Sequence, residues 1–370
     1  MDKSALDGDL SNGTRELPWL DWIRFGAALA VLVFHARQMT FVAYGDLPAE
    51  QRSLLVQIFF AVTRPGREAV LVFFVLSGFL VGGRVLERVA NRTFDVGAYF
   101  IDRSTRLFLP LIPALCLGAL AGLLVGPPVT LATFLGTALN VQGFLTPLMS
   151  SNGPLWSLAY EWWFYVLAGS LAAATINVGR AAAICVALTA VCLLGLGELE
   201  LLVSWVLGAL AYLWRPARAQ SWLLAAIVGI AIFALVQIQF GQEGVLSNPR
   251  IALVPLATST LLFSGATAMA IAMLSTIPPP AGRGRGIYAA GSFLASFSYS
   301  LYLTHYPLLW VALAWWPQDK LSVTSLTGYA LRIAACLGFA VLMYWLFERH
   351  TAPLRRLVRH AFSRPTPPPA

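Results

Sequence analysis

The chain has 370 residues, of which 58% are hydrophobic and only 11% are charged, and its formal net charge is +8. A soluble domain carries about 25% charged residues, so this composition excludes an ordinary soluble protein and indicates a polytopic membrane protein whose main partner is the lipid bilayer. In such a chain the basic surplus is first a topology signal, and we expect no nucleic acid partner.

Apolar segments follow one another along the chain, each close to the ~20 residues that an α-helix needs to cross a bilayer. This pattern predicts an all-α, polytopic membrane helix bundle with about ten transmembrane helices. The expected helices cover residues 19–40, 68–86, 107–125, 154–175, 181–197, 199–214, 221–240, 251–276, 289–313 and 325–347.

Three connections between these segments are distinctive. Residues 41–66 form a polar loop, and residues 84–106 form a basic loop. Residues 126–153 contain no charge and are punctuated by Pro and Gly, which is compatible with a re-entrant or interfacial segment.

The distribution of basic residues predicts the orientation of the bundle. With the N-terminus in the cytoplasm, most of the 25 Lys and Arg residues fall on the inner side. Only a few fall outside: Arg52, Arg64, Arg67, Arg250 and Lys320. The positive-inside rule then places both termini in the cytoplasm, with an N-terminal tail at 1–17, a transmembrane domain at 18–350 and a basic, proline-rich tail at 351–370.

Two ionisable residues lie inside the first span. Arg24 and His35 are about three helical turns apart, so they share one face and are separated by roughly 16 Å along the axis. A charged side chain in hydrocarbon costs at least ~2.5–3.5 kcal/mol, which makes such a residue a candidate for function. Alternatively, Arg24 reaches the near interface, helped by Asp21 one turn away, and His35 bonds to a neighbouring helix.

Two later spans carry further candidates. Glu161 lies in the aromatic segment NGPLWSLAYEWWFYV, and His305 lies in the hydroxyl-rich segment SFSYSLYLTHYPLLW. Given the alternating span directions, His35, Glu161 and His305 fall at comparable depth, which favours an acid–base site with His35 and Glu161 as its closest pair. The structural alternatives are an aromatic anchor with a buried ion pair for Glu161 and a packing histidine for His305.

A pair of arginines lies at the expected inner mouth of the third span. Arg103 and Arg106, in YFIDRSTRLFLP, are one helical turn apart, so both guanidinium groups share a face. At a helix N-terminus they would bind phosphate, with Arg24 on the same inner side and an extended arm reaching toward His35. The alternative is ordinary anchoring at the inner interface. A further arginine in the last span, Arg332, has no partner that the sequence identifies.

Five motifs together resemble the acyltransferase-3 family of bacterial integral membrane O-acyltransferases. They occur in family order between about residues 17 and 350, and they are LDWIRFGAALAVLVFHA, FFVLSGFLVG, RSTR, GPLWSLAYEWWFY and FSYSLYLTHYPL. The resemblance implies a cytoplasmic acyl-CoA donor and a hydroxyl acceptor on an envelope or exported glycan. The important positions of the family carry over to Arg24, His35, Arg103, Arg106 and Glu161.

We therefore expect a multi-pass enzyme of the bacterial inner membrane that transfers an acyl group, with acetyl as the expected group, from acyl-CoA to a carbohydrate hydroxyl without a metal. Arg103, Arg106 and Arg24 would hold the CoA phosphates. His35 would act as general base or carry the acyl group, and Glu161 would orient the imidazolium, with His305 as a further catalytic candidate.

Two other functions fit the same residues. In a proton-coupled transporter or a flippase of a glycan precursor, Arg24, His35 and Glu161 would bind substrate or relay protons. The absence of a visible internal repeat disfavours many transporter folds. A non-catalytic membrane subunit that only binds a partner is the third alternative.

Overall fold

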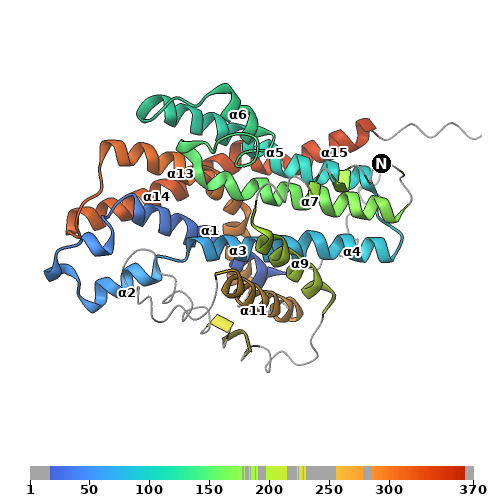
Figure 1. The fold of residues 1–370 in the computed structure, drawn as a ribbon, viewed down its shortest axis with the longest axis horizontal. Coiled ribbons are helices and arrows are strands. Elements are labelled where there is room, and N and C mark those ends of the chain that lie inside the picture. Colours follow the sequence, from blue (N-terminus) through green and yellow to red (C-terminus); the bar gives the residue numbers. More distant parts are fainter. Residues whose placement is uncertain are drawn as a thin grey trace, which may run out of the picture.

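The computed structural model describes residues 17–176, 197–214, 256–277 and 285–362, with single residues between 179 and 190 and between 223 and 230. In these parts the chain forms helices and loops without a β-sheet, which confirms the all-α prediction (Figure 1). The expected spans 181–197 and 221–240 lie largely outside the described residues, as do residues 1–16 and 363–370.

The principal helices agree with most of the expected apolar segments. They are α1 (Pro18–Gln38), α2 (Leu54–Val62), α3 (Gly66–Ser77), α4 (Gly83–Ala90), α5 (Val96–Val125), α6 (Leu131–Ala138), α7 (Trp156–Thr175), α9 (Leu199–Leu213), α11 (Leu256–Thr276), α12 (Arg285–Ser296), α13 (Ser298–Trp315), α14 (Val323–Leu346) and α15 (Thr351–Phe362). Among the described residues, five helical stretches are long and apolar enough to cross a membrane: Trp19–Gln38, Leu54–Ala90, Val96–Val125, Ala257–Thr276 and Val323–Phe362. That ten segments cross stays a prediction.

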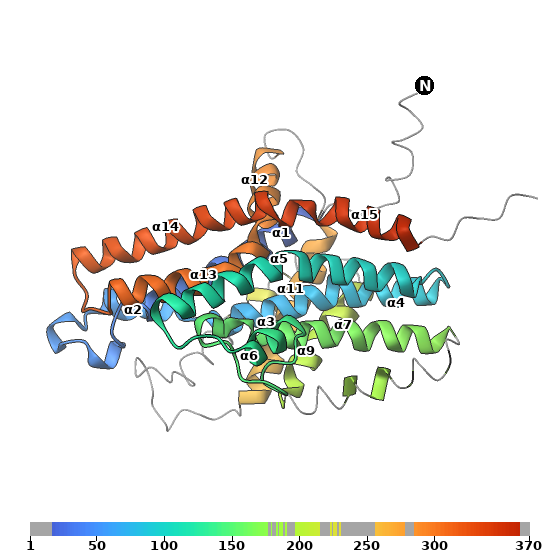
Figure 2. The same cartoon turned by 90° about the horizontal axis from the view of Figure 1, so that it is seen from above.

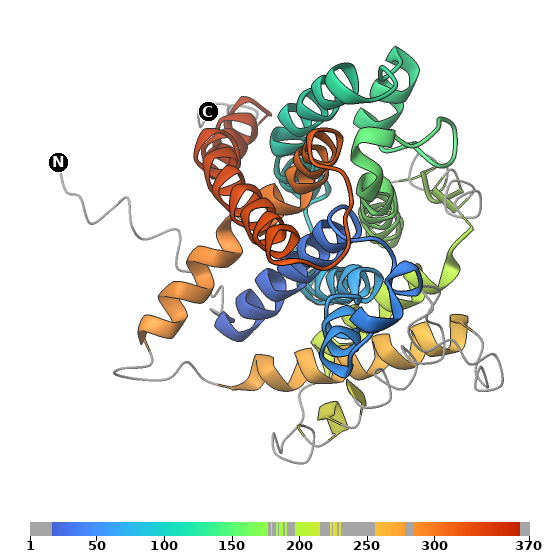
Figure 3. The ribbon, with the colours of Figure 1, turned by 90° about the vertical axis from the view of Figure 1, so that its left-hand side faces the viewer.

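Most of the long helices share one direction. The α3–α4 stretch, α5, α7 and the α14–α15 stretch run along the longest axis of the molecule (Figures 1 and 2). Helices α11 and α12 cross this direction, as the view down the long axis shows (Figure 3). Helix α1 packs against both α3 and α13, so it lies in the centre of the bundle.

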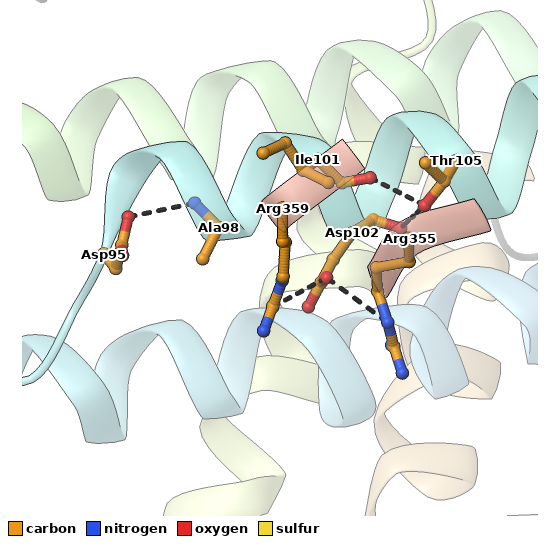
Figure 4. A network of polar contacts seen from close by, with 7 residues as sticks. All are labelled: Asp95, Ala98, Ile101, Asp102, Thr105, Arg355 and Arg359. Atoms are coloured by element: carbon orange, nitrogen blue, oxygen red, sulfur yellow. Dashed lines mark hydrogen bonds and ion pairs between the residues drawn. The ribbon is translucent and has the colours of Figure 1, made fainter. Parts of the chain in front are cut away.

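Helix α5 begins earlier than the sequence predicted. Asp95 accepts a hydrogen bond from the Ala98 backbone N–H at 2.9 Å and caps the helix at its N-terminus (Figure 4). Residues 96–106, which were expected to lie in a loop, are therefore helical. The prediction that Arg103 and Arg106 lie at a helix N-terminus is wrong, because both arginines are more than a turn inside α5.

The expected span 289–313 is two helices, α12 and α13, that meet at Phe297. The N–H groups of the first turn of a helix have no partner inside that helix. At the start of α13, Glu348 accepts hydrogen bonds from the Ser300 backbone N–H at 3.0 Å and from its hydroxyl at 2.6 Å. A carboxylate distant in the sequence thus supports the new helix start.

Glycines let α9 pack closely against the helix that follows α3. The chain continues from α3 through a π-helical segment, η4 (Gly78–Gly82), into α4. A Cβ atom at Gly78 would overlap the carbonyl oxygen of Trp205, and one at Gly208 would overlap that of Val75. The small residues therefore serve helix packing here, and they bring Trp205 next to Ser77.

Candidate active site

A central cavity of about 280 Å³ lies where α1, α3–α4, α5, α7 and α13 meet. Its charged lining consists of four arginines and a single carboxylate: Arg24, Arg84, Arg103, Arg106 and Glu161. Hydroxyl groups and apolar side chains complete the wall, among them Ser77, Tyr165, Tyr299, Tyr302, Phe73, Phe74 and Leu158. Such a cavity combines an excess of positive charge with an apolar surface.

Apart from Arg24, the cavity arginines form no ion pair with a carboxylate among the described residues. Among the described residues, no carboxylate lies within salt-bridge distance of Arg103 or Arg106. The buried Nε of Arg103 has no hydrogen-bond acceptor either, and its guanidinium carbon lies 5.8 Å from the centre of the Tyr165 ring. Arg24 differs, because its Nη1 lies 3.2 Å from Asp21 Oδ1, which confirms the expected pair. Unpaired guanidinium groups in a cavity favour an anionic ligand.

A hydrogen-bonded chain holds Glu161 in the wall of the cavity. The Tyr165 hydroxyl donates to Glu161 Oε1, so the Ser77 hydroxyl, 3.0 Å from the Tyr165 oxygen, must donate to Tyr165. The indole N–H of Trp205 donates in turn to Ser77 at 3.2 Å. The chain of donors runs from Trp205 to the carboxylate, which fixes the position of Glu161.

The two membrane histidines contact each other. His35 Nδ1 and His305 Nε2 are 3.0 Å apart. His305 Nδ1 lies 3.0 Å from the Leu301 carbonyl and 2.9 Å from the Tyr302 carbonyl, so this nitrogen carries a hydrogen. In the neutral pair His305 Nε2 is then the acceptor, and His35 Nδ1 is the donor. The lone pair of His35 Nε2 is left free to accept a proton.

Packing between α1 and α13 explains why the histidines meet. Ala28, Leu32 and Ala36 of α1 share one buried cluster with Leu301 and Leu309 of α13. His305 itself is almost fully buried, whereas His35 is half-buried. The sequence placed the two histidines at similar depth, but it could not show that their helices are neighbours.

The structure therefore divides the candidate residues into two groups. Arg24, Arg103, Arg106 and Glu161 line the cavity, whereas neither histidine is among its lining residues. The expectation that Glu161 is the closest partner of His35 is wrong, because His35 bonds to His305 and Glu161 bonds to Tyr165. Tyr302 connects the groups, since it lines the cavity and its carbonyl lies 2.9 Å from His305 Nδ1.

Sequence reasoning missed two charged residues near the cavity. Glu348 interacts electrostatically with Arg24 and Arg106 while it caps α13. Arg84 lines the cavity from α4. Neither residue was among the site candidates of the sequence analysis. The sequence feature that could have identified them is their position: Arg84 closely follows the motif FFVLSGFLVG, and Glu348 follows the last span.

Arg332 also has its partners assigned by the structure. This buried arginine donates from Nη1 to the Met39 carbonyl at 3.2 Å and to the Thr40 hydroxyl at 2.6 Å. Its Nη2 donates to the Ala312 carbonyl at 3.3 Å and to the Trp316 carbonyl. Carbonyl groups at a helix C-terminus lack partners within the helix and favour a cation. Arg332 thus joins the ends of α1 and α13, the helices that carry the histidines.

The turn that carries His305 has a second support. Pro307 lacks an N–H, so the Leu303 carbonyl loses the donor that a regular helix would supply. The side chain of Asn152 replaces it, since its Nδ2 donates to the Leu303 carbonyl at 2.9 Å. The segment η5 (Ser150–Leu155) thereby contacts α13 two residues before His305.

Taken together, the fold and the site define an all-helical membrane protein with a cationic cavity next to a histidine pair. Among the residues described, no group of three or more His, Cys, Asp or Glu side chains could hold a metal ion. The acyltransferase-3 family model, described as an acyltransferase domain, matches residues 17–345. The chain therefore belongs to the acyltransferase-3 family, which confirms the resemblance of its motifs and supports a transferase that acts on acyl groups. No curated protein and no solved structure matches the chain.

Proposed function

We propose that the protein is an acyl-CoA-dependent O-acyltransferase of the bacterial inner membrane, which moves an acyl group, expected to be acetyl, to a hydroxyl of an envelope or exported glycan. One feature supports this function above the others: Tyr302, which lines the arginine-rich cavity, also contacts His305 of the histidine pair. An acyl-CoA needs such a combination, because its phosphates are anionic and its thioester must meet a base.

The donor would enter from the side of the cavity that carries the arginines. Arg103 and Arg106, with Arg24 and Arg84 nearby, would bind the phosphates of CoA. The pantetheine arm would extend along the apolar wall toward Tyr302. The excess of Lys and Arg in the loops assigned to the inner side favours a cytoplasmic origin of this donor.

His35 would act as the general base, because its Nε2 holds the free lone pair of the histidine pair. It takes the proton of the acceptor hydroxyl while the hydroxyl oxygen forms a bond to the thioester carbonyl carbon. The carbon–sulfur bond then breaks, and the CoA sulfur leaves with the proton from His35. In a two-step variant, Nε2 attacks the thioester carbonyl carbon, the carbon–sulfur bond breaks and CoA leaves as thiolate. The acceptor hydroxyl then attacks the acyl-imidazole, which breaks the carbon–nitrogen bond, and the hydroxyl proton is taken up by the thiolate.

His305 and Glu161 would assist from different positions. His305 holds His35 in the required tautomer and shares the positive charge that develops on the pair, in place of the role that the sequence had assigned to Glu161. Glu161 faces the cavity and would accept hydrogen bonds from bound substrate. The carbohydrate acceptor would approach from the outer half of the bundle.

Thioester cleavage separates this function from the alternatives. Purified full-length protein in lipid nanodiscs is incubated with acetyl-CoA, and free CoA thiol is measured with and without membranes that supply glycan acceptors. We expect CoA release that increases with the acceptor membranes. A transporter, flippase or partner-binding subunit would leave the thioester intact. CoA release that does not depend on the active site, and so does not exceed the background rate, would refute the proposal.

A further inference from the structure

The acidic residue next to the cavity arginines has an unexpected partner. Asp102 and Arg106 lie four residues apart on α5, the spacing at which opposite charges pair on one helix. Asp102 Oδ1 instead lies 2.7 Å from Arg359 Nη2 and 3.7 Å from Arg355 Nε, both on α15 (Figure 4). The side chain of Asp102 is only 13% exposed, so α15 covers it.

The other carboxylates around the cavity are also occupied. Asp21 pairs with Arg24, Glu161 accepts from Tyr165, and Glu348 accepts from Ser300. Among the described residues, none of these carboxylates lies within salt-bridge distance of Arg103 or Arg106, although Glu348 interacts electrostatically with Arg106. Of the four carboxylates, only Asp102 has the i, i+4 spacing from Arg106 that lets two side chains pair on one helix. Release of Asp102 would therefore have the most direct effect on Arg106.

From this arrangement we infer that α15 keeps the anion site open: Arg355 and Arg359 retain Asp102 and thereby leave Arg106 free for a phosphate of the donor. Arg355 and Arg359 are positioning residues that act through Asp102 and do not touch the ligand. This inference rests on the proposed function, since it concerns the same arginines. It assigns a role to the helix that follows the last long span, which the sequence had treated only as a basic tail.

The test compares three variants for acetyl-CoA affinity in nanodiscs. In Arg355→Ala/Arg359→Ala, the released Asp102 competes with the ligand for Arg106, and we expect acetyl-CoA affinity to be about threefold to tenfold weaker. The lower limit corresponds to the energy of a weak ion pair on one helix, and the upper limit to the loss of one charge-assisted contact. Asp102→Asn alone should bind as wild type or slightly tighter. Adding Asp102→Asn to the double variant should restore the affinity.

A purely structural role for α15 predicts a different pattern. Asp102→Asn would then weaken binding as much as the double variant, because it breaks the same contact, and the triple variant would stay weak. Either that pattern or wild-type affinity in the double variant would overturn the inference. If the double variant is unfolded by size-exclusion chromatography, Arg359→Ala alone, which removes the shorter contact, replaces it in the same comparison.

Two controls complete the design. Arg356→Ala removes a charge from the exposed face of α15, where the described residues offer it no ion pair, and should leave affinity unchanged. Repeating the measurements in 1 M salt, where the Debye length is about 3 Å, removes the long-range effect of charge. Failure of wild-type protein to bind acetyl-CoA would refute the proposed function, whereas normal binding that ignores Arg355 and Arg359 would refute only this inference.

Discussion

Two regions of the bundle contain arginines, and they treat the charge in opposite ways. Where α1 and α13 end, Arg332 uses both terminal nitrogens on three carbonyl groups and one hydroxyl. In the cavity, Arg103 and Arg106 have no acidic partner within the described part of the chain. In both regions the arginines lie within long apolar helices. The set of partners therefore distinguishes an arginine that holds helices together from one that is available to a ligand.

The largest effect is expected between these regions, at His35. His35→Ala removes the proposed base and should lower the rate of acyl transfer by ~10²–10⁴-fold, with normal amounts of protein in the membrane. The rate is measured as CoA release with acceptor membranes, and the protein level by immunoblot. A correctly inserted variant that keeps most of its activity would make the histidine pair a packing contact.

Arg332 should behave as a structural residue. Arg332→Met keeps the volume but removes the hydrogen bonds that join the ends of α1 and α13, at a cost of about 3 kcal/mol in the free energy of unfolding. We expect a lower thermal midpoint of the purified protein, with nearly unchanged acetyl-CoA affinity in the fraction that remains folded. Weaker binding without loss of stability would contradict the contrast between the two regions.

Arg103 and Arg106 should give the opposite result. Arg103→Ala and Arg106→Ala should each weaken acetyl-CoA binding about tenfold, because a charge-assisted contact to phosphate is lost, while the thermal midpoint stays near that of wild type. Lys at either position should restore only part of the affinity, since it lacks the planar guanidinium fork. Unchanged affinity in the double Ala variant would return both residues to membrane anchoring.

The sequence predicted the local features of this protein well. Hydropathy located most of the described helices, and helical spacing predicted the Asp21–Arg24 pair. Hydropathy failed where polar residues extend a helix, as at α5, whose start depends on the Asp95 cap. It also missed the break at Phe297, because the carboxylate that supports α13 comes from Glu348, far along the chain.

The neighbours of the site residues were harder to predict than their depth. Depth follows from counting residues along a helix, and it placed His35, Glu161 and His305 at one level. Which helices touch depends on the packing of small and apolar faces, and only the structure shows that α1 packs on α13, with Ala28 and Ala36 in the same buried cluster as Leu301. Thus the histidine pair could not be derived from the spacing, although both of its members could.

The hydrogen bond to the Leu303 carbonyl affects which amino-acid substitutions this protein tolerates. Pro307 withholds a donor from that carbonyl, and Asn152 supplies one across 151 residues of sequence. Loss of Asn152 alone leaves a buried carbonyl bare, and loss of Pro307 alone creates a second donor that competes for it. The two positions therefore form a compensating pair, in which substitution at one is tolerated most readily when the other changes as well.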